Sequence, residues 1–295
     1  MASSTAWALP DIPAGTAAPA DLLARREALR ALDALQLVDE NANVSEERIA
    51  GIPCVIVAAP AARATMIYAH GGGFRLGEPK TWTGFATRLA MAAGIRIVLP
   101  DYRLAPEHPF PAALQDLVAV YRALCDEVDI PLLLGGDSAG GGLACSLALL
   151  ATNAGQPASA VALLSPWLDL SANAASYAEC AASDASFSAA AALEAAQAYL
   201  AGQGPDTAYA SPLRHPSLAA FPPLWVAVSG CEVLRDDTLD FAHRIARMGG
   251  SVDLSVYPDL PHVWPILQAH TSETERTIQS MAQFLARSGD LRKLD

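Results

Sequence analysis

The sequence has few cysteines, little positive charge and no long apolar run, and each shortage excludes a class of protein. Its 295 residues include only five cysteines, an odd number without a Cys-x-x-Cys pair. Such usage favours reduced thiols and offers no metal-site spacing. A formal net charge of −12 argues against binding to nucleic acid or to anionic membranes. No apolar run reaches the ~18 residues that a membrane-spanning helix needs.

The N-terminal residues also lack a positively charged region followed by an apolar core. We therefore expect no signal peptide, and together with the cysteine usage this favours a cytoplasmic protein. Hydrophobic residues make up 52% and charged residues 17% of the chain, which is typical of a globular protein with a sizeable core. The length fits one large α/β domain or two small ones.

Residues 131–153 carry the strongest chemical signal in the chain. An apolar run at 132–134 precedes a Gly-x-Ser-x-Gly motif made by Gly136, Ser138 and Gly140, and an alanine-rich apolar segment follows. This order predicts a strand, a sharp turn and a helix, the setting of a nucleophile elbow. The serine would then stand at a helix N-terminus, where developing negative charge is favoured. A structural glycine-rich turn is the alternative.

Three successive glycines, Gly71, Gly72 and Gly73, follow a predicted buried strand at 65–69 and the residue His70. A run of glycines leaves the backbone amides unshielded, which favours an oxyanion loop that points into a pocket. A flexible turn is the alternative. We expect His70 to fix this loop through a bond from its ring to the backbone and not to act as the base.

Strands and helices alternate from residue 65 onward, which predicts a mostly parallel sheet with helices on both faces. The expected strands are 44–49, 53–58, 65–69, 95–99, 132–134, 160–164, 224–228 and 252–256. The expected helices include 22–38 (with Leu22, Leu29, Leu32 and Leu35 at helical spacing), 79–93, 112–125, 188–201 and a terminal helix with a Ser272–Glu275 capping box. Chemistry in such sheets lies at the carboxyl ends of the strands.

A long segment at about residues 170–214 separates two predicted strands and is largely helical in pattern. It is too long for a plain connection in a compact sheet. We interpret it as a helical cap over the active site, joined there by an N-terminal cap segment, residues 1–42. Residues 43–295 then form the catalytic core that carries this insertion.

A nucleophilic serine needs a base, and the base needs an acid to orient it. Of the six histidines only His262 lies in a loop directly after the last predicted strand. The acid should follow the preceding strand, where Glu232, Asp236 and Asp237 compete. We favour Glu232, because the two aspartates fall where a helix begins and acidic residues commonly interact with its dipole. Asp236 stays the second candidate. The order Ser138, Glu232, His262 is that of the α/β-hydrolase fold.

With these residues assigned, the chain resembles the hormone-sensitive-lipase-like bacterial esterases (family IV) of the α/β-hydrolase superfamily. The likeness runs from about residue 68 to residue 264. Three blocks carry it: His-Gly-Gly-Gly-Phe at 70–74, Asp-Tyr-Arg-Leu-Ala-Pro-Glu-His-Pro-Phe-Pro-Ala at 101–112 and Gly-Asp-Ser-Ala-Gly-Gly at 136–141. The resemblance implies that Gly72, Gly73 and Ala139 supply the oxyanion amides, that the cap has the two parts named above, and that short-chain carboxylic esters are hydrolysed.

Two positions depart from the family's pattern. The family's acid is usually an aspartate followed by Pro-Leu, whereas this chain has Glu232, Val233 and Leu234. The longer side chain moves the carboxylate, although glutamate is a known alternative acid in this fold. The glycine that often follows the family's catalytic histidine is Val263 here, and we expect this side chain to narrow the pocket.

The sequence thus predicts a serine carboxylesterase with a Ser138–Glu232–His262 triad, without cofactor or metal, acting on a small-molecule ester. A lactone hydrolase with the same triad and a non-catalytic small-molecule-binding homologue are the alternatives. Epoxide and haloalkane chemistry is disfavoured, because those enzymes of the fold need an aspartate at the position of Ser138. We expect no nucleic-acid or membrane partner. The oligomeric state stays open, and a homodimer is compatible with the sequence.

Overall fold

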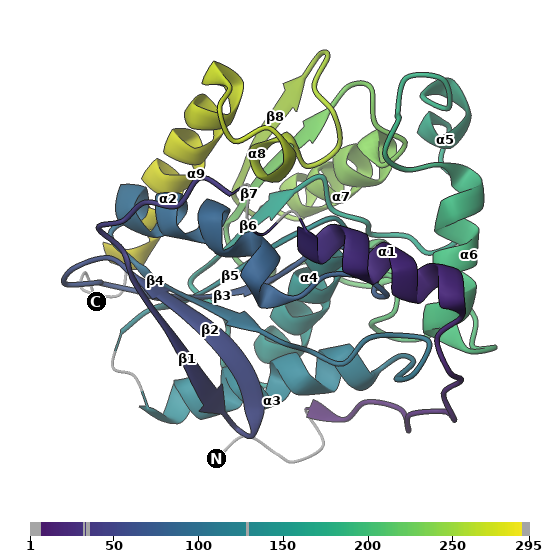
Figure 1. The fold of residues 1–295 in the computed structure, drawn as a ribbon, viewed down its shortest axis with the longest axis horizontal. Coiled ribbons are helices and arrows are strands. Elements are labelled where there is room, and N and C mark those ends of the chain that lie inside the picture. Colours follow the sequence, from purple (N-terminus) through teal and green to yellow (C-terminus); the bar gives the residue numbers. More distant parts are fainter. Residues whose placement is uncertain (1–6, 32, 34–35, 128–129, 291–295) are drawn as a thin grey trace.

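The computed structural model describes residues 7–31, 33, 36–127 and 130–290 and arranges them around a central twisted sheet (Figure 1). In these residues the sheet has eight strands in the order β1-β2-β4-β3-β5-β6-β7-β8. β1 is antiparallel to β2 and β2 to β4, whereas β4, β3 and β5–β8 run parallel to one another. The mostly parallel sheet is as predicted. The strands are β1 (Asn43–Ile49), β2 (Ile52–Ala58), β3 (Thr65–Ala69), β4 (Arg96–Pro100), β5 (Leu132–Asp137), β6 (Ala160–Leu164), β7 (Leu224–Ser229) and β8 (Val252–Tyr257).

Helices cover both faces of the sheet, and two separate apolar clusters fill the space beneath them. α2 and α9 pack on one face, and α3, α4 and α7 pack on the other (Figure 1). None of the described helices combines the length and apolar character needed to cross a bilayer. The helices are α1 (Ala20–Arg30), η3 (Pro79–Trp82), α2 (Thr83–Ala93), α3 (Ala112–Glu127), α4 (Ser138–Asn153), α5 (Ser176–Glu179), α6 (Ala189–Leu200), η4 (Pro212–Arg214), α7 (Arg235–Arg247), α8 (Trp264–Leu267) and α9 (Ser272–Asp290).

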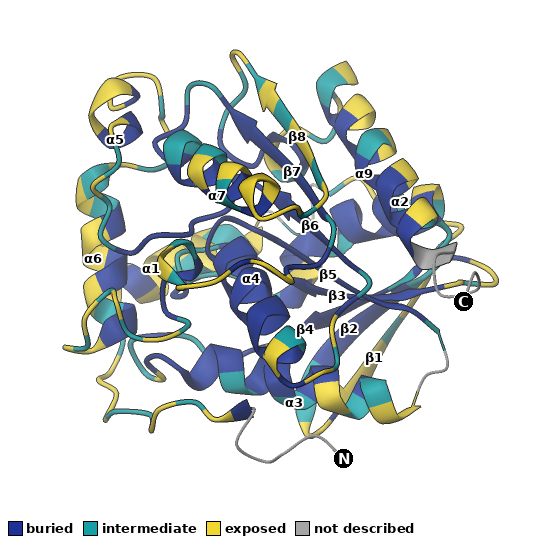
Figure 2. Ribbon diagram, turned by 180° about the vertical axis from the view of Figure 1, so that it is seen from behind, coloured by how far each residue is buried: buried dark blue, intermediate teal, exposed yellow. Residues whose placement is uncertain are grey.

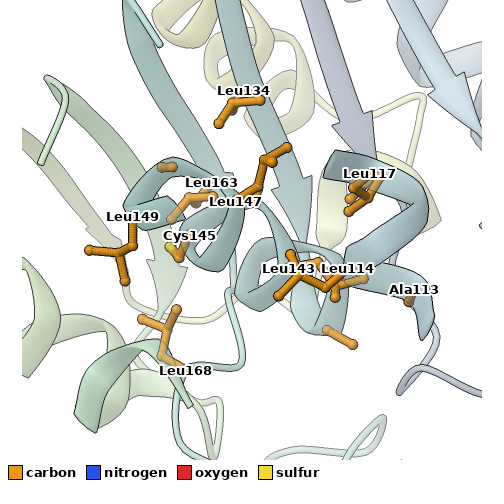
Figure 3. Close-up of a cluster of buried hydrophobic side chains, with 14 of the residues drawn as sticks. Ala113, Leu114, Leu117, Leu134, Leu143, Cys145, Leu147, Leu149, Leu163 and Leu168 are labelled. Atoms are coloured by element: carbon orange, nitrogen blue, oxygen red, sulfur yellow. The ribbon is translucent and has the colours of Figure 1, made fainter. Parts of the chain in front are cut away.

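The helix α4 is the most buried helix of the fold and fixes the start of the site. Nearly all of its residues are buried, and most of the helix is dark in Figure 2. Figure 3 shows Leu143 and Leu147 of α4 in one cluster with Leu114 and Leu117 of α3. A helix that is apolar on every side is held by packing all round. Its first residue, Ser138, therefore has a rigid support.

One sequence-based prediction about a helix end and one about a helix cap are wrong. The first helix ends at Arg30 and does not reach residue 38, since residues 36–38 are not helical. There the side chain of Gln36 accepts a hydrogen bond from the amide of Gly84 and donates one to the carbonyl of Lys80, which ties the chain to α2 and η3 instead. Leu32, Leu35 and residues 1–6 of the expected cap segment lie outside the described residues.

The terminal helix begins as predicted, but its cap is different. The hydroxyl of Thr271 accepts from the amide of Thr274, at 3.2 Å, so Thr271 and not Ser272 is the capping residue. Glu275 does not close a capping box and pairs with Arg88 of α2, at 2.9 Å. Thr271 and Ser272 are neighbouring residues that can each cap a helix. The pairing of Glu275 with Arg88 removes the partner that a capping box at Ser272 would need.

Candidate active site

The turn between β5 and α4 holds Ser138 in a conformation that few side chains adopt. Its φ is +51°, in the left-handed region where a residue other than glycine is strained. A Cβ atom on Gly140 would lie 2.1 Å from the carbonyl oxygen of Ala69 and 2.2 Å from that of His70. Only glycine lets α4 approach β3 this closely. The motif therefore forms a sharp turn at the end of β5 with Ser138 at its tip.

Three predicted side chains meet at the carboxyl edge of the sheet. The Nε2 atom of His262 lies 2.9 Å from the hydroxyl of Ser138, and its Nδ1 atom lies 2.6 Å from Oε2 of Glu232. Ser138 follows β5, Glu232 follows β7 and His262 follows β8. Each is less than a tenth exposed. In this relay the imidazole, oriented by the carboxylate, can activate the serine oxygen as a nucleophile.

The second oxygen of Glu232 is fixed by groups that the sequence analysis did not identify. Oε1 accepts from the hydroxyl of Ser165, at 2.7 Å, and from the amide of Ser229, at 2.8 Å. Ser165 directly follows β6, the strand beside β7. The position of Ser165 just after a predicted strand is the one feature of the sequence that could have placed it at the site. The two donors orient the carboxylate so that Oε2 faces the histidine.

The competing aspartates have other partners. Asp236 accepts from the amide of Ser176 and pairs with Arg235, and within the described residues it makes no hydrogen bond with His262. Asp237 is buried in the first turn of α7, and burial raises its pKa to about 8. Of the three candidate acids, Glu232 is the one that the structure brings to the histidine.

Two opposing effects act on His262. Burial works to lower its pKa, because a charged imidazolium is poorly solvated there. The charge of Glu232 and its hydrogen bond to the ring outweigh burial, so the pKa of His262 lies above its usual value. An imidazole whose basicity is raised in this way is suited to accept a proton from Ser138.

The glycine loop after β3 folds back on itself beside the serine. The carbonyl of Gly72 accepts from the amides of Arg75 and Leu76, at 3.1 and 2.9 Å. Gly72 has a φ of +113°, and a Cβ atom there would lie 2.2 Å from the carbonyl oxygen of Leu76. In the described part of the chain the amides of Gly72 and Gly73 donate no hydrogen bond. Ala139 is the second residue of α4, where an amide has no acceptor within the helix.

A buried carboxyl that the sequence analysis did not single out holds this loop against the elbow. Oδ1 of Asp137 accepts from the amide of Gly71, the hydroxyl of Tyr68 and the indole of Trp82, at 3.1, 3.1 and 2.8 Å. Burial raises the pKa of Asp137 to about 7, although these donors and His262 oppose the rise. The Gly-x-Ser-x-Gly motif shows that Asp137 stands next to the serine, but nothing in the sequence identifies its three hydrogen-bond donors.

His70 fixes the loop as predicted, and its ring makes no hydrogen bond to Ser138, Glu232 or His262 in the described residues. Its Nδ1 atom lies 2.8 Å from the carbonyl oxygen of Gly71, and its ring stacks on Tyr102 at 4.3 Å. Burial lowers the pKa of His70 to about 4, so the ring is neutral in ordinary buffers. The exposed His108 and its neighbour Glu107 also lie outside the relay, and Glu107 pairs with Arg26 of α1.

Ser138 and His262 open into a mainly apolar cavity of about 370 Å³. Three aromatic residues, Trp82, Phe85 and Phe187, line the cavity, whereas Trp167 and Trp264 are fully buried in the core. Within the described ranges no three or more His, Cys, Asp or Glu side chains are grouped so as to hold a metal ion.

Val263 lines this cavity directly after the histidine, in an unusual backbone conformation. Its φ is +48°, which a β-branched residue rarely adopts. A glycine would fit this backbone without strain and would leave the space of the side chain open. Val263 lies in the cavity wall, which agrees with the expectation that its side chain narrows the pocket.

Comparison with known proteins agrees with this geometry. Residues 66–266 match a family model described as an alpha/beta hydrolase fold. The chain is 37% identical over 224 residues to an acetyl-hydrolase from Streptomyces hygroscopicus, covering 75% of both chains. It is 32% identical over 248 residues to an esterase from Acinetobacter venetianus, covering 80% of both. Its fold is similar to the crystal structure of an esterase from the bacterial hormone-sensitive lipase family, with a TM-score of 0.87, 34% identity and coverage of 92% and 93%.

Proposed function

Because the chain belongs to the hormone-sensitive-lipase-like esterases of the α/β-hydrolase superfamily and is a carboxylic ester hydrolase, we propose that it cleaves short-chain esters through a Ser138–Glu232–His262 triad. The observation that supports the triad most directly is the continuous relay from the serine hydroxyl through both imidazole nitrogens to the carboxylate. Neither Asp236 nor Asp237 offers such a relay.

In the acylation step His262 takes the proton of Ser138 at Nε2 while the serine oxygen attacks the ester carbonyl carbon. Glu232 stabilises the imidazolium that results. The carbonyl oxygen becomes an oxyanion, which the amides of Gly72, Gly73 and Ala139 stabilise. Collapse of this intermediate breaks the bond to the alcohol oxygen, and His262 returns the proton to the leaving alcohol. An acyl-serine remains.

Deacylation repeats the same steps with water as the nucleophile. His262 removes a proton from the water, the hydroxide attacks the acyl carbon, and the same amides stabilise the second oxyanion. The bond to the serine oxygen then breaks, the serine takes back its proton, and the carboxylic acid leaves. Nothing beyond the substrate and water is consumed.

The size of the cavity supports a small substrate. A volume of about 370 Å³ lies at the lower end of the ~300–1,000 Å³ usual for small-molecule pockets. Its apolar lining suits an unbranched acyl or alkyl group, and Val263 occupies part of the space next to the base.

We also propose that residues 1–42 and about 170–214 act as a cap on a core of residues 43–295. In support, side chains of both segments line the cavity: Arg25 and Leu29 of α1, and Ser186, Phe187, Ala191 and Ala195 in and before α6. These segments carry none of the residues of the proton relay. They would shape access to the site and leave the chemistry to the core.

Labelling by an organophosphonate, followed by peptide mass spectrometry, tests the nucleophile. We expect a single adduct on Ser138 and none in Ser138→Ala. The same preparation is then given chromogenic acetyl, butyryl and octanoyl esters and a set of lactones, and we expect turnover to be greatest for the short acyclic esters. Preference for lactones would favour a lactone hydrolase. A folded protein with neither adduct nor turnover would favour a non-catalytic homologue.

A further inference from the structure

Arg75 follows the glycine loop and is almost completely buried, which is unusual for an arginine. It lies two residues after Gly73, in the turn that closes on the carbonyl of Gly72. Its side chain is 7% exposed and also lines the cavity. The sequence analysis gave it no role, and the proton relay does not use it.

The guanidinium of Arg75 connects the loop to α6. Its Nη1 atom lies 2.6 Å from Oε1 of Glu194, which is 62% exposed on that helix. Two neighbouring contacts join the same partners. Phe74 stacks on Tyr199 of α6 with ring centroids 3.8 Å apart, and a Cβ atom on Gly73 would lie 3.6 Å from that of Ala195. Thus α6 rests directly on the segment that carries the two free amides.

The carbonyl of Arg75 connects the loop to α1. It accepts from Nε of Arg26, at 2.8 Å, while the rest of that guanidinium binds both carboxylate oxygens of Glu107 and the carbonyl of Ala105. Arg26 is therefore held in a fork-like arrangement that fixes its direction. Residues of both α1 and α6 line the cavity, and residue 75 is bonded to both helices.

We propose that Arg75 is a positioning residue that couples α1 and α6 to the oxyanion turn of Gly72 and Gly73. The inference rests on the proposed function of that turn. Neither helix can move away from the cavity without breaking a bond to residue 75. The amides beside it are useful only where they meet the developing oxyanion, so a small displacement of the turn lowers the rate of the chemical step more than it weakens substrate binding.

The test compares Arg75→Met, Arg75→Lys, Arg26→Met and Glu194→Gln with the wild-type protein, using a chromogenic acetyl ester. Titration with an organophosphonate counts the active sites, so that unfolded protein does not enter kcat. Glu275→Gln is the matched control, because Glu275 is likewise exposed, at 56%, and pairs with an arginine, Arg88, whose side chain is only 12% exposed. It joins α9 to α2, away from the oxyanion turn.

We expect Arg75→Met and Arg26→Met to lower kcat ~10–100-fold with KM changed less than ~3-fold, since loss of one oxyanion donor costs ~10²–10³. Arg75→Lys should restore part of kcat through its charge, Glu194→Gln should lower kcat slightly, and Glu275→Gln should leave it unchanged.

Three outcomes would overturn the inference. A raised KM with unchanged kcat would mean that Arg75 binds the substrate itself. A lower melting temperature with unchanged kcat per active site would mean that its role is only structural. Unchanged values throughout would mean that the contacts carry no coupling. A wild-type protein without any turnover would instead refute the proposed function, which keeps the two failures distinct.

Discussion

Glutamine in place of Glu232 removes the charge of the proposed triad acid and keeps its size, so it isolates what that carboxylate does. The side chain of residue 232 lies between two kinds of neighbour. One of its oxygens faces two donors, the hydroxyl of Ser165 and the amide of Ser229, and the other faces Nδ1 of His262. A glutamine would keep its carbonyl oxygen toward the two donors. Its NH2 group must then point at the histidine.

This orientation has a chemical consequence. An NH2 group donates, so Nδ1 of His262 would have to be the acceptor and the ring proton would move to Nε2. The ring then presents N–H to Ser138 and cannot accept its proton. We expect kcat to fall ~10⁴-fold, the loss associated with a triad locked in the wrong tautomer. That factor corresponds to ~5.5 kcal/mol of transition-state stabilisation.

The assay is the hydrolysis of a chromogenic acetyl ester by Glu232→Gln, with folding checked by circular dichroism. Asp236→Asn is the control, because the carboxylate of Asp236 accepts from the amide of Ser176 and makes no hydrogen bond to the histidine in the described part of the chain. We expect it to stay within ~3-fold of wild type. A Glu232→Gln protein with near-normal kcat, or a large loss in Asp236→Asn, would refute the assignment of the acid and the tautomer argument with it.

Four further expectations follow from the same geometry. Ser138→Ala should lose ~10⁶-fold in kcat, measured with the acetyl ester. The acid limb of kcat/KM should have an apparent pKa above 6.5, because Glu232 raises the pKa of His262, and activity should fall as pH falls through it; a limb well below that value would contradict the pairing. Burial raises the pKa of Asp137 to about 7 in the folded protein, so the folded state binds a proton that the unfolded state has already released. The free energy of unfolding of the wild type should therefore fall by ~2 kcal/mol relative to Asp137→Asn as the pH rises from about 5.5 to about 8.5. Urea unfolding at each pH measures this difference. Val263→Gly should raise the ratio of kcat/KM for octanoyl over acetyl esters ~3–10-fold; an unchanged ratio would mean that Val263 does not limit chain length.

Much of the fold could be predicted because its signals are local. Buried parallel strands have short apolar runs, and helices between them have their own caps and glycine stops, so the alternation from residue 65 onward was visible in the sequence. The position of the site followed from the same alternation, since all its predicted residues come directly after strands. Helix ends were less predictable: Gln36 and Thr271 decide two of them through contacts that composition does not reveal.

The supporting groups of the site could not be predicted, because they depend on which strands become neighbours. Ser165 reaches Glu232 only because β6 lies beside β7, and Tyr68 reaches Asp137 only because β3 lies beside β5. The sequence order of strands does not give that arrangement: β4 lies outside β3 in the sheet. Long-range polar contacts of this kind follow from topology, which periodicity alone leaves open.

The structure also offers a physical reason why a glutamate can stand where the family usually has an aspartate. The longer side chain does not simply extend further toward His262. One oxygen of Glu232 turns back to accept from the amide of Ser229, three residues earlier in the same turn, while the other reaches the imidazole at 2.6 Å. The extra methylene is thus taken up within the turn after β7, and Ser165 holds the carboxylate from the neighbouring strand. The departure in sequence therefore leaves the relay to Ser138 intact.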